Sequence, residues 1–340
     1  MIVQPSLTEF DVLQNGVLRL YGEKQEQALD KVLADRLGLA YTEYRTKWNG
    51  SDRSSKHSYP IHLDFELNDS CNQSCVMCPR NTTTHTETGY ELGTKKKLSI
   101  NTFTRIMQES SRYNLKSINL GAYAEPLTHK DFFQFTKIAS EFGIIDIRMI
   151  TNGILLTQQV SDEILKSSVT NIFISIDAAT KETYSNIRGS GFEKVLSNVD
   201  YLLKKRTELS SKIPFIRVSF VNMINNTMEL SNFLSYWHGK VDFIDVQPGE
   251  DLSENPNVER NYSDRKKRFK CISPWQRLSI LANGDIIPCC SFYGRYIPIG
   301  NIEHTSLHKA WTSVEMEKVR KSLLSETSSV CETCQSSTLL

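Results

Sequence analysis

The stretch IHLDFELNDSCNQSCVMCPR (61–80) contains a strand pattern that leads directly into three closely spaced cysteines. Its first eight positions alternate apolar and polar residues, which is typical of a strand whose two faces meet different surroundings. The apolar face holds Ile61, Leu63, Phe65 and Leu67, and the polar face holds His62, Asp64, Glu66 and Asn68. The pattern predicts a strand that ends where the cysteines begin.

Five further strand patterns follow along the chain, separated by segments with helical periodicity. The strands are expected at 117–121, 146–151, 171–177, 214–222 and 241–247. The intervening amphipathic segments include 99–113 and 192–206. Ahead of the strands, a further helix is expected at about 23–37, with Gly38 as its stop. Such alternation predicts right-handed β-α-β units and a parallel sheet. Six units indicate an α/β fold with a partial (β/α)6 TIM-like barrel.

The polar strand faces indicate what the barrel encloses. The alternation of the first strand is repeated in 171–177 and 214–222. If helices cover the outside, these polar faces point inward and line a cavity suited to a polar ligand. The alternative is a half-solvated antiparallel sheet, which the intervening helices disfavour. The cysteines after the first strand lie at its carboxyl end, where the sites of parallel α/β folds gather.

The first cysteine group, Cys71, Cys75 and Cys78, supplies three thiolates. A structural zinc site takes four ligands, and so does an iron-sulfur cubane held by protein alone. Three thiolates therefore leave one metal coordination position open to a small molecule.

The second cysteine group lies near the carboxyl terminus. It consists of Cys271, the adjacent pair Cys289 and Cys290, and the closely spaced Cys331 and Cys334. One member of the pair and the other three make a complete set of four. This set fits either a zinc site or a second 4Fe-4S cluster, with either Cys289 or Cys290 as its fourth ligand.

The composition excludes several classes of protein. The 340 residues are 39% apolar and 23% charged, so the chain can bury a core, and its formal net charge is +1. That balance lacks the basic field of a binder of nucleic acid or of an anionic membrane. The absence of an apolar export signal or membrane span predicts a cytoplasmic protein with reduced cysteines.

The first cysteine group, with Asn72 within it and Pro79 after it, resembles the signature of the radical S-adenosylmethionine (SAM) enzyme superfamily. The segments CISPWQRLSILANGDIIPCC (271–290) and CETC (331–334) resemble the SPASM/twitch extension of part of that superfamily. The resemblance implies three parts. They are an N-terminal extension (1–58), a radical SAM partial barrel (59–250) and a small auxiliary-cluster domain (251–340).

The resemblance also implies cofactors and their ligands. Cys71, Cys75 and Cys78 would hold a 4Fe-4S cluster with an open site for SAM, and the second group would hold an auxiliary 4Fe-4S cluster. The SAM contacts expected from the family's motifs are Glu125, Asn152, Ser175 and Arg188. In GAYAEP (121–126), alanines stand at 122 and 124, where the family usually has glycines.

Several polar residues near the expected strand ends are candidates for contacts with substrate. They are Tyr123, Arg217, Ser219, Asp245 and Gln247. Cys290 becomes a spare thiol if Cys289 ligates the second cluster. A spare thiol near a radical site could donate a hydrogen atom, and the alternative is a small buried apolar side chain.

The resemblance implies an enzyme that cleaves SAM to a 5′-deoxyadenosyl radical, which takes hydrogen from a small polar substrate. We expect a carbohydrate or cyclitol substrate and either dehydrogenation or epimerisation. Two alternatives remain: a maturase of ribosomal peptides, and a non-catalytic metal-binding scaffold. An external low-potential electron donor of the flavodoxin or ferredoxin type is also implied, with no nucleic-acid or membrane partner.

Overall fold

The computed structural model describes residues 10–12, 18–20, 22–81, 95–248, 271–289 and 298–328. Within these residues, no helix is long and apolar enough to cross a membrane.

Six parallel strands form the centre of the molecule. They are β3 (His62–Phe65), β4 (Ser117–Leu120), β5 (Asp146–Thr151), β6 (Val169–Ser175), β7 (Phe215–Asn222) and β8 (Phe243–Pro248). Each strand pairs in parallel with the next one in sequence. This is the order expected from six successive β-α-β units, so the predicted parallel sheet is confirmed and the antiparallel alternative is wrong.

The sheet continues beyond the six strands on both sides, which the sequence patterns did not predict. β9 (Arg277–Ile280) pairs in parallel with β3 and is followed by β10 (Asp285–Ile287) and β11 (Gly300–Asn301). The hairpin of β1 (Phe10–Val12) and β2 (Leu18–Leu20) pairs antiparallel with β8. The result is an open sheet of eleven strands among the described residues, with β1 and β11 at its two ends.

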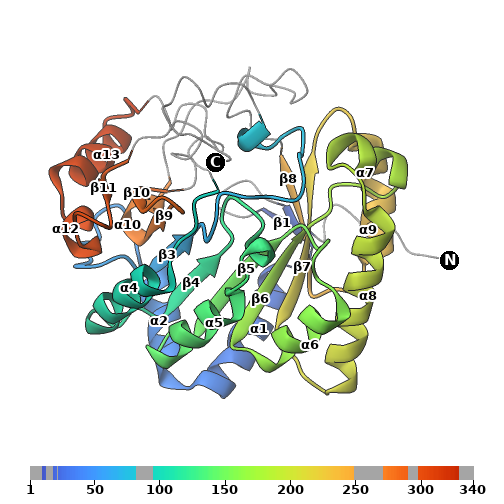
Figure 1. The fold of residues 1–340 in the computed structure, drawn as a ribbon, viewed down its shortest axis with the longest axis horizontal. Helices are drawn as coiled ribbons and strands as arrows, with labels where there is room; N and C mark the ends of the chain where they lie inside the picture. Colours follow the sequence, from blue (N-terminus) through green and yellow to red (C-terminus); the bar gives the residue numbers. More distant parts are fainter. Residues whose placement is uncertain are drawn as a thin grey trace.

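Helices cover the outer face of the curved sheet (Figure 1). They are α4 (Ile100–Arg112), α5 (Phe132–Glu141), α6 (Gln158–Lys166), α7 (Lys181–Ile187), α8 (Phe192–Glu208) and α9 (Leu230–Trp237). In α4, the Ser99 side chain caps the helix by accepting a hydrogen bond from Thr102 N at 3.0 Å. Phe103 and Met107 of this helix are fully buried in the main core. The outer apolar faces of the strands are thus sealed by helices.

The N-terminal part of the chain packs on the sheet through two helices. The predicted helix is α1 (Gly22–Leu37), which Gly38 ends at φ +69, and α2 (Leu39–Asn49) follows at once. Leu33 and Tyr44 of these helices lie in one buried cluster with Phe243 of β8. The extension is therefore part of the barrel's packing.

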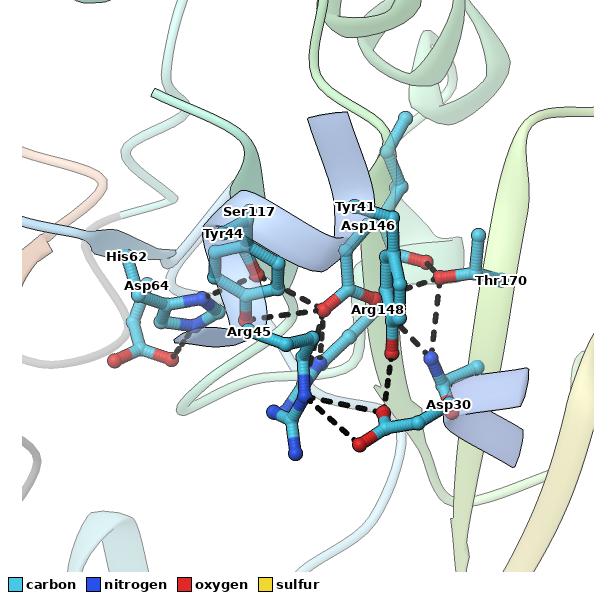
Figure 2. A network of polar contacts seen from close by, with 12 residues as sticks. Asp30, Tyr41, Tyr44, Arg45, His62, Asp64, Ser117, Asp146, Arg148 and Thr170 are labelled. Atoms are coloured by element: carbon cyan, nitrogen blue, oxygen red, sulfur yellow. Dashed lines mark hydrogen bonds and ion pairs between the residues drawn. The ribbon is translucent and has the colours of Figure 1, made fainter. Parts of the chain in front are cut away.

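A buried polar network joins α2 to the inward faces of the first barrel strands (Figure 2). Asp146 of β5 accepts hydrogen bonds from Tyr44 of α2 at 3.3 Å, from Ser117 of β4 at 3.1 Å and from Thr170 of β6 at 2.8 Å. Its carboxylate also pairs with Arg148 at 2.8 Å.

The network contains charged groups that burial would otherwise disfavour. Burial acts to raise the pKa of Asp146, but the Arg148 charge and the hydrogen bonds from Arg148 and Thr170 together outweigh it and lower that pKa to about 2. Near the amino-terminal strand ends, these polar groups therefore bond to one another and to α2. The strand pattern alone had suggested that these groups line a cavity. At this end of the strands they instead bond to one another.

The C-terminal part forms a small apolar cluster beside β9. Its elements are α10 (Ser273–Gln276), α12 (Leu307–Trp311) and α13 (Val314–Leu324), together with β10 and β11. The cluster contains Trp275, Leu281, Ile287, Cys289, Val319 and Leu323. One sheet therefore runs through the barrel and into the part that holds the second cysteine group.

Candidate active site

The three cysteines of the first group lie on the loop that leaves the carboxyl end of β3. Cys71 is exposed, and Cys75 and Cys78 are half-buried. Cys78 N donates to Cys75 O at 3.1 Å, so the loop turns tightly between these two thiols. Val76 N donates to Ile187 O at 2.9 Å and ties the loop to α7. Backbone bonds thus hold the thiols at the rim of the barrel.

Donors from two other elements approach the thiols. Asn152 Nδ2 lies 3.9 Å from Cys71 Sγ, and Arg188 Nη1 lies 3.7 Å from Cys75 Sγ. Burial raises the pKa of the Cys75 thiol to about 11, while the Arg188 charge acts in the opposite direction. A bound metal would favour the thiolate outright. Three thiols with cationic and amide donors beside them fit an anionic iron-sulfur cluster.

A site for a single metal ion would require several side chains that converge on one point. Among the described residues, no three His, Cys, Asp or Glu side chains converge on one ion position. In a cubane each thiolate binds its own iron atom, so the sulfur atoms need not converge on one point. This arrangement of the three thiols is therefore compatible with a cubane cluster at this loop.

Glu125, at the carboxyl end of the second barrel strand, is buried beside the cysteine loop. Its Oε1 accepts from Thr151 Oγ1 at 2.9 Å and from Leu127 N at 3.2 Å, and its Oε2 accepts from Asn152 N at 2.7 Å. Burial raises the pKa of Glu125 to about 7, although these hydrogen bonds act to lower it. One acceptor position on Oε2 remains for a ligand.

The loop before Glu125 depends on a glycine. Gly121 has φ +90, and a Cβ there would lie 2.6 Å from Pro126 Cγ and 2.7 Å from Ile150 O. Gly121 N and Ala122 N both donate to Phe65 O at the end of β3. The ends of β3, β4 and β5 therefore lie close together here, although alanines occupy positions 122 and 124.

Asn152 connects the loop after β5 to the cysteine loop. Its side chain donates to Asn72 Oδ1 at 2.7 Å, while its backbone N binds Glu125. Two of the expected SAM contacts, Glu125 and Asn152, are thus brought together beside Cys71.

Arg188 lies at the end of α7, buried among polar groups. Its Nε donates to Asp177 Oδ2 at 2.7 Å, and its Nη2 pairs with the same oxygen. The half-buried Ser175 is the last residue of β6, and Asp177 lies two residues after it. The Arg188 guanidinium thus lies between Asp177 and Cys75.

Asp177 is a site residue that the sequence did not reveal. It is fully buried and has φ 61, a left-handed conformation that Asp tolerates better than most residues. Its Oδ1 accepts from Val221 N at 2.7 Å, and its backbone oxygen accepts from Asn226 Nδ2 at 2.8 Å. The ISID segment (174–177) gave the position of a strand end, but nothing in it marked this carboxylate as the partner of Arg188.

Glu66 is the second residue missed. Its fully buried carboxylate accepts from Arg80, just after Cys78, at 3.4 Å and from Ala282 N at 3.0 Å. Arg80 also donates to the backbone oxygen of Asp69. One carboxylate therefore contacts both the first cysteine loop and the turn between β9 and β10. The alternating pattern placed Glu66 on the polar face but gave no partner.

The candidate substrate residues of β7 and β8 are largely paired with one another. Arg217 Nη1 lies 3.3 Å from Asp245 Oδ2, and its guanidinium lies 4.2 Å from the Phe173 ring centre. Ser219 is buried beside them, and Gln247 is half-buried near the end of β8. Tyr123 instead packs against the C-terminal apolar cluster.

Three buried side-chain oxygens on neighbouring strands make no hydrogen bond within the described residues. They are Asp64 Oδ2, Asn119 Oδ1 and Ser279 Oγ. The strand register pairs Asp64 with both Asn119 and Ser279, so the three share one level of the barrel interior. Asp64 Oδ2 lies 3.6 Å from Arg277 Nη1 in an ion pair, so its charge has a partner. The oxygens of Asn119 and Ser279, which make no hydrogen bond within the described residues, indicate a polar ligand or ordered water at this level.

The second cysteine group is described in part. Cys289 is buried in the C-terminal cluster, and Cys271 packs against the same cluster. Ser273 N donates to Cys271 Sγ at 3.4 Å. Cys290, Cys331 and Cys334 lie outside the described residues. The two described thiols of the expected auxiliary site are thus brought into one cluster.

Comparison with family models gives two matches. Residues 65–230 match the radical SAM superfamily, and residues 271–335 match the iron-sulfur cluster-binding domain named SPASM. The first match contains the three-cysteine loop, and the second contains Cys271, Cys289, Cys331 and Cys334.

Among curated relatives, the AdoMet-dependent heme synthase of Methanosarcina barkeri is 29% identical over 43% of this chain and 40% of its own length. The mycofactocin maturase MftC of Mycobacterium tuberculosis is 30% identical over 39% of this chain and 31% of its own length. The chain thus spans less than half the length of these two relatives.

Two solved structures share the fold at 14% sequence identity. SuiB of Streptococcus suis, bound to its precursor peptide SuiA, has a TM-score of 0.62 and covers 87% of this chain and 74% of its own. BtrN in complex with AdoMet and 2-DOIA has a TM-score of 0.52 and covers 81% of this chain and 91% of its own.

Proposed function

Because the chain belongs to the radical SAM superfamily and carries an iron-sulfur domain of the SPASM type, we propose that it modifies a peptide substrate by radical chemistry. The observation that carries the proposal is the loop of three thiols at the barrel rim, with Arg188, Asn152 and Glu125 beside it. When bound, the cluster and SAM supply a reductively generated 5′-deoxyadenosyl radical that takes hydrogen from a C–H bond.

The residues of the first loop would hold this cofactor pair. Cys71, Cys75 and Cys78 are the proposed cluster ligands. The Arg188 guanidinium, 3.7 Å from Cys75 Sγ, offsets the negative charge of a thiolate-bound cluster. Asp177 keeps the guanidinium in place, so Arg188 would act from a fixed position near SAM.

Glu125 and Asn152 would bind the amino-acid end of SAM. The free acceptor position of Glu125 Oε2 suits the SAM ammonium group, and the ammonium charge would favour the ionised form of this buried carboxyl. Asn152 holds both Glu125 and Asn72, which sets the distance between the SAM site and the cysteine loop. Ser175 remains a proposed contact of the SAM ribose.

The substrate would enter the polar interior from the rim. Arg217 and Gln247 are proposed to orient it, together with the side-chain oxygens of Asp64, Asn119 and Ser279 that make no hydrogen bond within the described residues. The resemblance to MftC and to SuiB, whose structure contains a precursor peptide, supports a peptide over the carbohydrate that we first expected. Cys271, Cys289, Cys331 and Cys334 are the proposed ligands of the auxiliary cluster. The divisions 1–58, 59–250 and 251–340, and an external electron donor, remain predictions.

The experiment uses short peptides encoded next to this gene. Protein reconstituted without oxygen is incubated with SAM, a reductant and each peptide, and the products are separated by liquid chromatography and mass spectrometry. We expect 5′-deoxyadenosine together with a mass change in one peptide. Peptides of unchanged mass, with turnover of a sugar or cyclitol instead, would contradict the peptide assignment.

A carbohydrate or cyclitol is the second candidate. It is favoured by the resemblance to BtrN and by the single auxiliary set of cysteines, one fewer cluster than a full SPASM domain requires. A product two hydrogens lighter would indicate dehydrogenation, and an equal mass with deuterium taken from solvent would indicate epimerisation. Zinc without iron in the purified protein would instead support a non-catalytic scaffold.

A further inference from the structure

A cavity lies apart from the barrel rim, between the segment before β3 and the C-terminal helices. Its volume is about 380 Å³. Its basic lining residues are Arg53, Lys56, His57 and Arg320, and Glu317 is its acidic one. Residues 51–58 precede β3, and α10 precedes the neighbouring parallel strand β9. The cavity is therefore near the amino-terminal ends of these strands, whereas the cysteine loop follows their carboxyl ends.

The cations of this cavity lack acidic partners. In the part of the chain that the structure describes, no carboxylate oxygen lies within 4.0 Å of a side-chain nitrogen of Arg53, Lys56 or Arg320. Glu317 pairs instead with Lys321 on the outer side of α13 at 3.9 Å. Among the lining residues only Glu317, whose charge also acts on Arg320, offsets the positive charge of the cavity.

Arg53 presents a buried hydrogen-bond donor that lacks an acceptor. Its Nη2 is buried and makes no hydrogen bond within the described residues. A guanidinium N–H group buried without an acceptor costs free energy, and an oxyanion would remove that cost. The missing partner is therefore an acceptor, and a negatively charged one binds best.

Arg320 is held in place by the protein but forms no ion pair within the described residues. Its Nε donates to Pro274 O at 3.1 Å, its Nη1 donates to Trp311 O at 3.2 Å, and its guanidinium stacks 4.3 Å from the Trp311 ring centre. Burial lowers the pKa of Arg320. Both carbonyl groups are neutral, so an anion near the remaining Nη2 would supply the charge that is missing.

We infer that this cavity binds a carboxylate-bearing stretch of the peptide substrate, away from the residue that reacts. The inference rests on the proposed function for its peptide source. Guanidinium groups suit carboxylates because their planar donors match two oxygens at once. The cavity is larger than one inorganic anion, and Leu324 and Thr312 extend its lining beside the cations. A side chain with its adjoining backbone therefore fits better than free phosphate.

The test measures binding of fluorescein-labelled hexaglutamate by anisotropy to the full, oxygen-free reconstituted protein. Hexaglutamine is the neutral control, and inorganic phosphate is a separate competitor. Arg53→Gln and Lys56→Glu change the cavity, and Lys194→Glu makes the same charge change on the exposed face of α8. We expect Kd for hexaglutamate to rise about tenfold in each cavity variant and to stay unchanged in Lys194→Glu.

Three results would overturn the inference. The first is an equal loss of affinity in Lys56→Glu and Lys194→Glu, because it would mean that only net charge matters. The second is binding of phosphate without binding of hexaglutamate. The third is no binding of either probe. Formation of 5′-deoxyadenosine is measured in the same samples, so a failure of this site is distinguished from a failure of the proposed chemistry.

Discussion

Arg188 and Asp177 illustrate how single residues prepare this site. The guanidinium is buried beside Cys75, and Asp177 receives two of its N–H groups. Without that carboxylate, the Arg188 side chain would lose both its orientation and its compensating charge. Asp177 therefore positions Arg188, and we propose that it affects SAM binding through this contact.

Asp177→Asn tests this role. The asparagine keeps an oxygen for Val221 N but cannot accept from Arg188 with its amide nitrogen. Loss of a charged hydrogen bond of about 1.5–3 kcal/mol corresponds to a rise in KM for SAM of about tenfold or more. Iron content should be unchanged, and Arg188→Lys should give a similar KM. An unaltered KM in both variants would refute the positioning role.

Glu125 gives a pH prediction. Its pKa in the SAM-free protein is raised to about 7 by burial, so the carboxylate proposed to bind the SAM ammonium is lost as pH falls below that value. We expect KM for SAM to rise as pH decreases from about 8 to about 6, because binding requires the ionised form.

In Glu125→Gln the KM for SAM should be high at every pH of that range, because the glutamine does not titrate. A pH dependence identical to that of the wild-type enzyme would assign the effect to another group.

The resemblance to the radical SAM signature implied which residues near the first cysteine group belong to the site. The cysteine loop, Glu125 and Asn152 each follow a recognisable strand end, and the structure brings them together. Asp177 and Glu66 could not be predicted, because their roles depend on partners far away in the sequence: Arg188 and Val221 for the first, and Ala282 for the second.

At the scale of elements, the contact between β3 and the C-terminal part passes through Glu66. Its buried carboxylate receives Arg80 from the cysteine loop and Ala282 N from the turn after β9. The six parallel strands were predictable because each is a short strand pattern separated from the next by a segment with helical periodicity. The pairing of β9 with β3 was not predictable, because the short apolar run of β9 does not indicate which strand it will pair with.

Glu66→Gln should weaken this junction. The substitution leaves the Arg80 charge buried without its carboxylate, a change that destabilises by about 3–5 kcal/mol in comparable pairs. We expect a clearly lower unfolding temperature, measured by calorimetry on protein kept free of oxygen. The matched control is Glu303→Gln, which breaks the exposed pair with Arg105 and should cost no more than about 1 kcal/mol. Equal effects of the two substitutions would show that the buried pair has no special role.

For the molecule as a whole, the N-terminal helices close the end of the barrel opposite the cysteine loop. Tyr44 of α2 reaches Asp146, and Trp48 contacts the ring of His62. The sequence predicted α1 and its end at Gly38, but α2 has aromatic residues whose partners lie on separate strands. The polar network therefore joins the extension to the barrel as one folded unit.

Asp146→Asn should destabilise this unit. The carboxylate has a pKa lowered to about 2, so its contribution is fully present above its ordinary pKa near 4 and is lost as pH falls toward 2. At neutral pH we expect a loss of about 3–5 kcal/mol in the free energy of unfolding, because Arg148 stays buried without its partner. Urea unfolding at neutral pH and at about pH 3 measures it. The wild-type and variant proteins should approach each other in acid, and a constant difference would contradict the assignment.

The most direct test of the account measures 5′-deoxyadenosine after reduced, iron-loaded protein is mixed with SAM in the absence of oxygen. We predict its formation by the wild-type protein, none by Cys71→Ala, and residual formation by Cys334→Ala with impaired modification of substrate. A fully iron-loaded wild-type protein that yields no 5′-deoxyadenosine would contradict the claim that its three thiols leave an iron open to SAM.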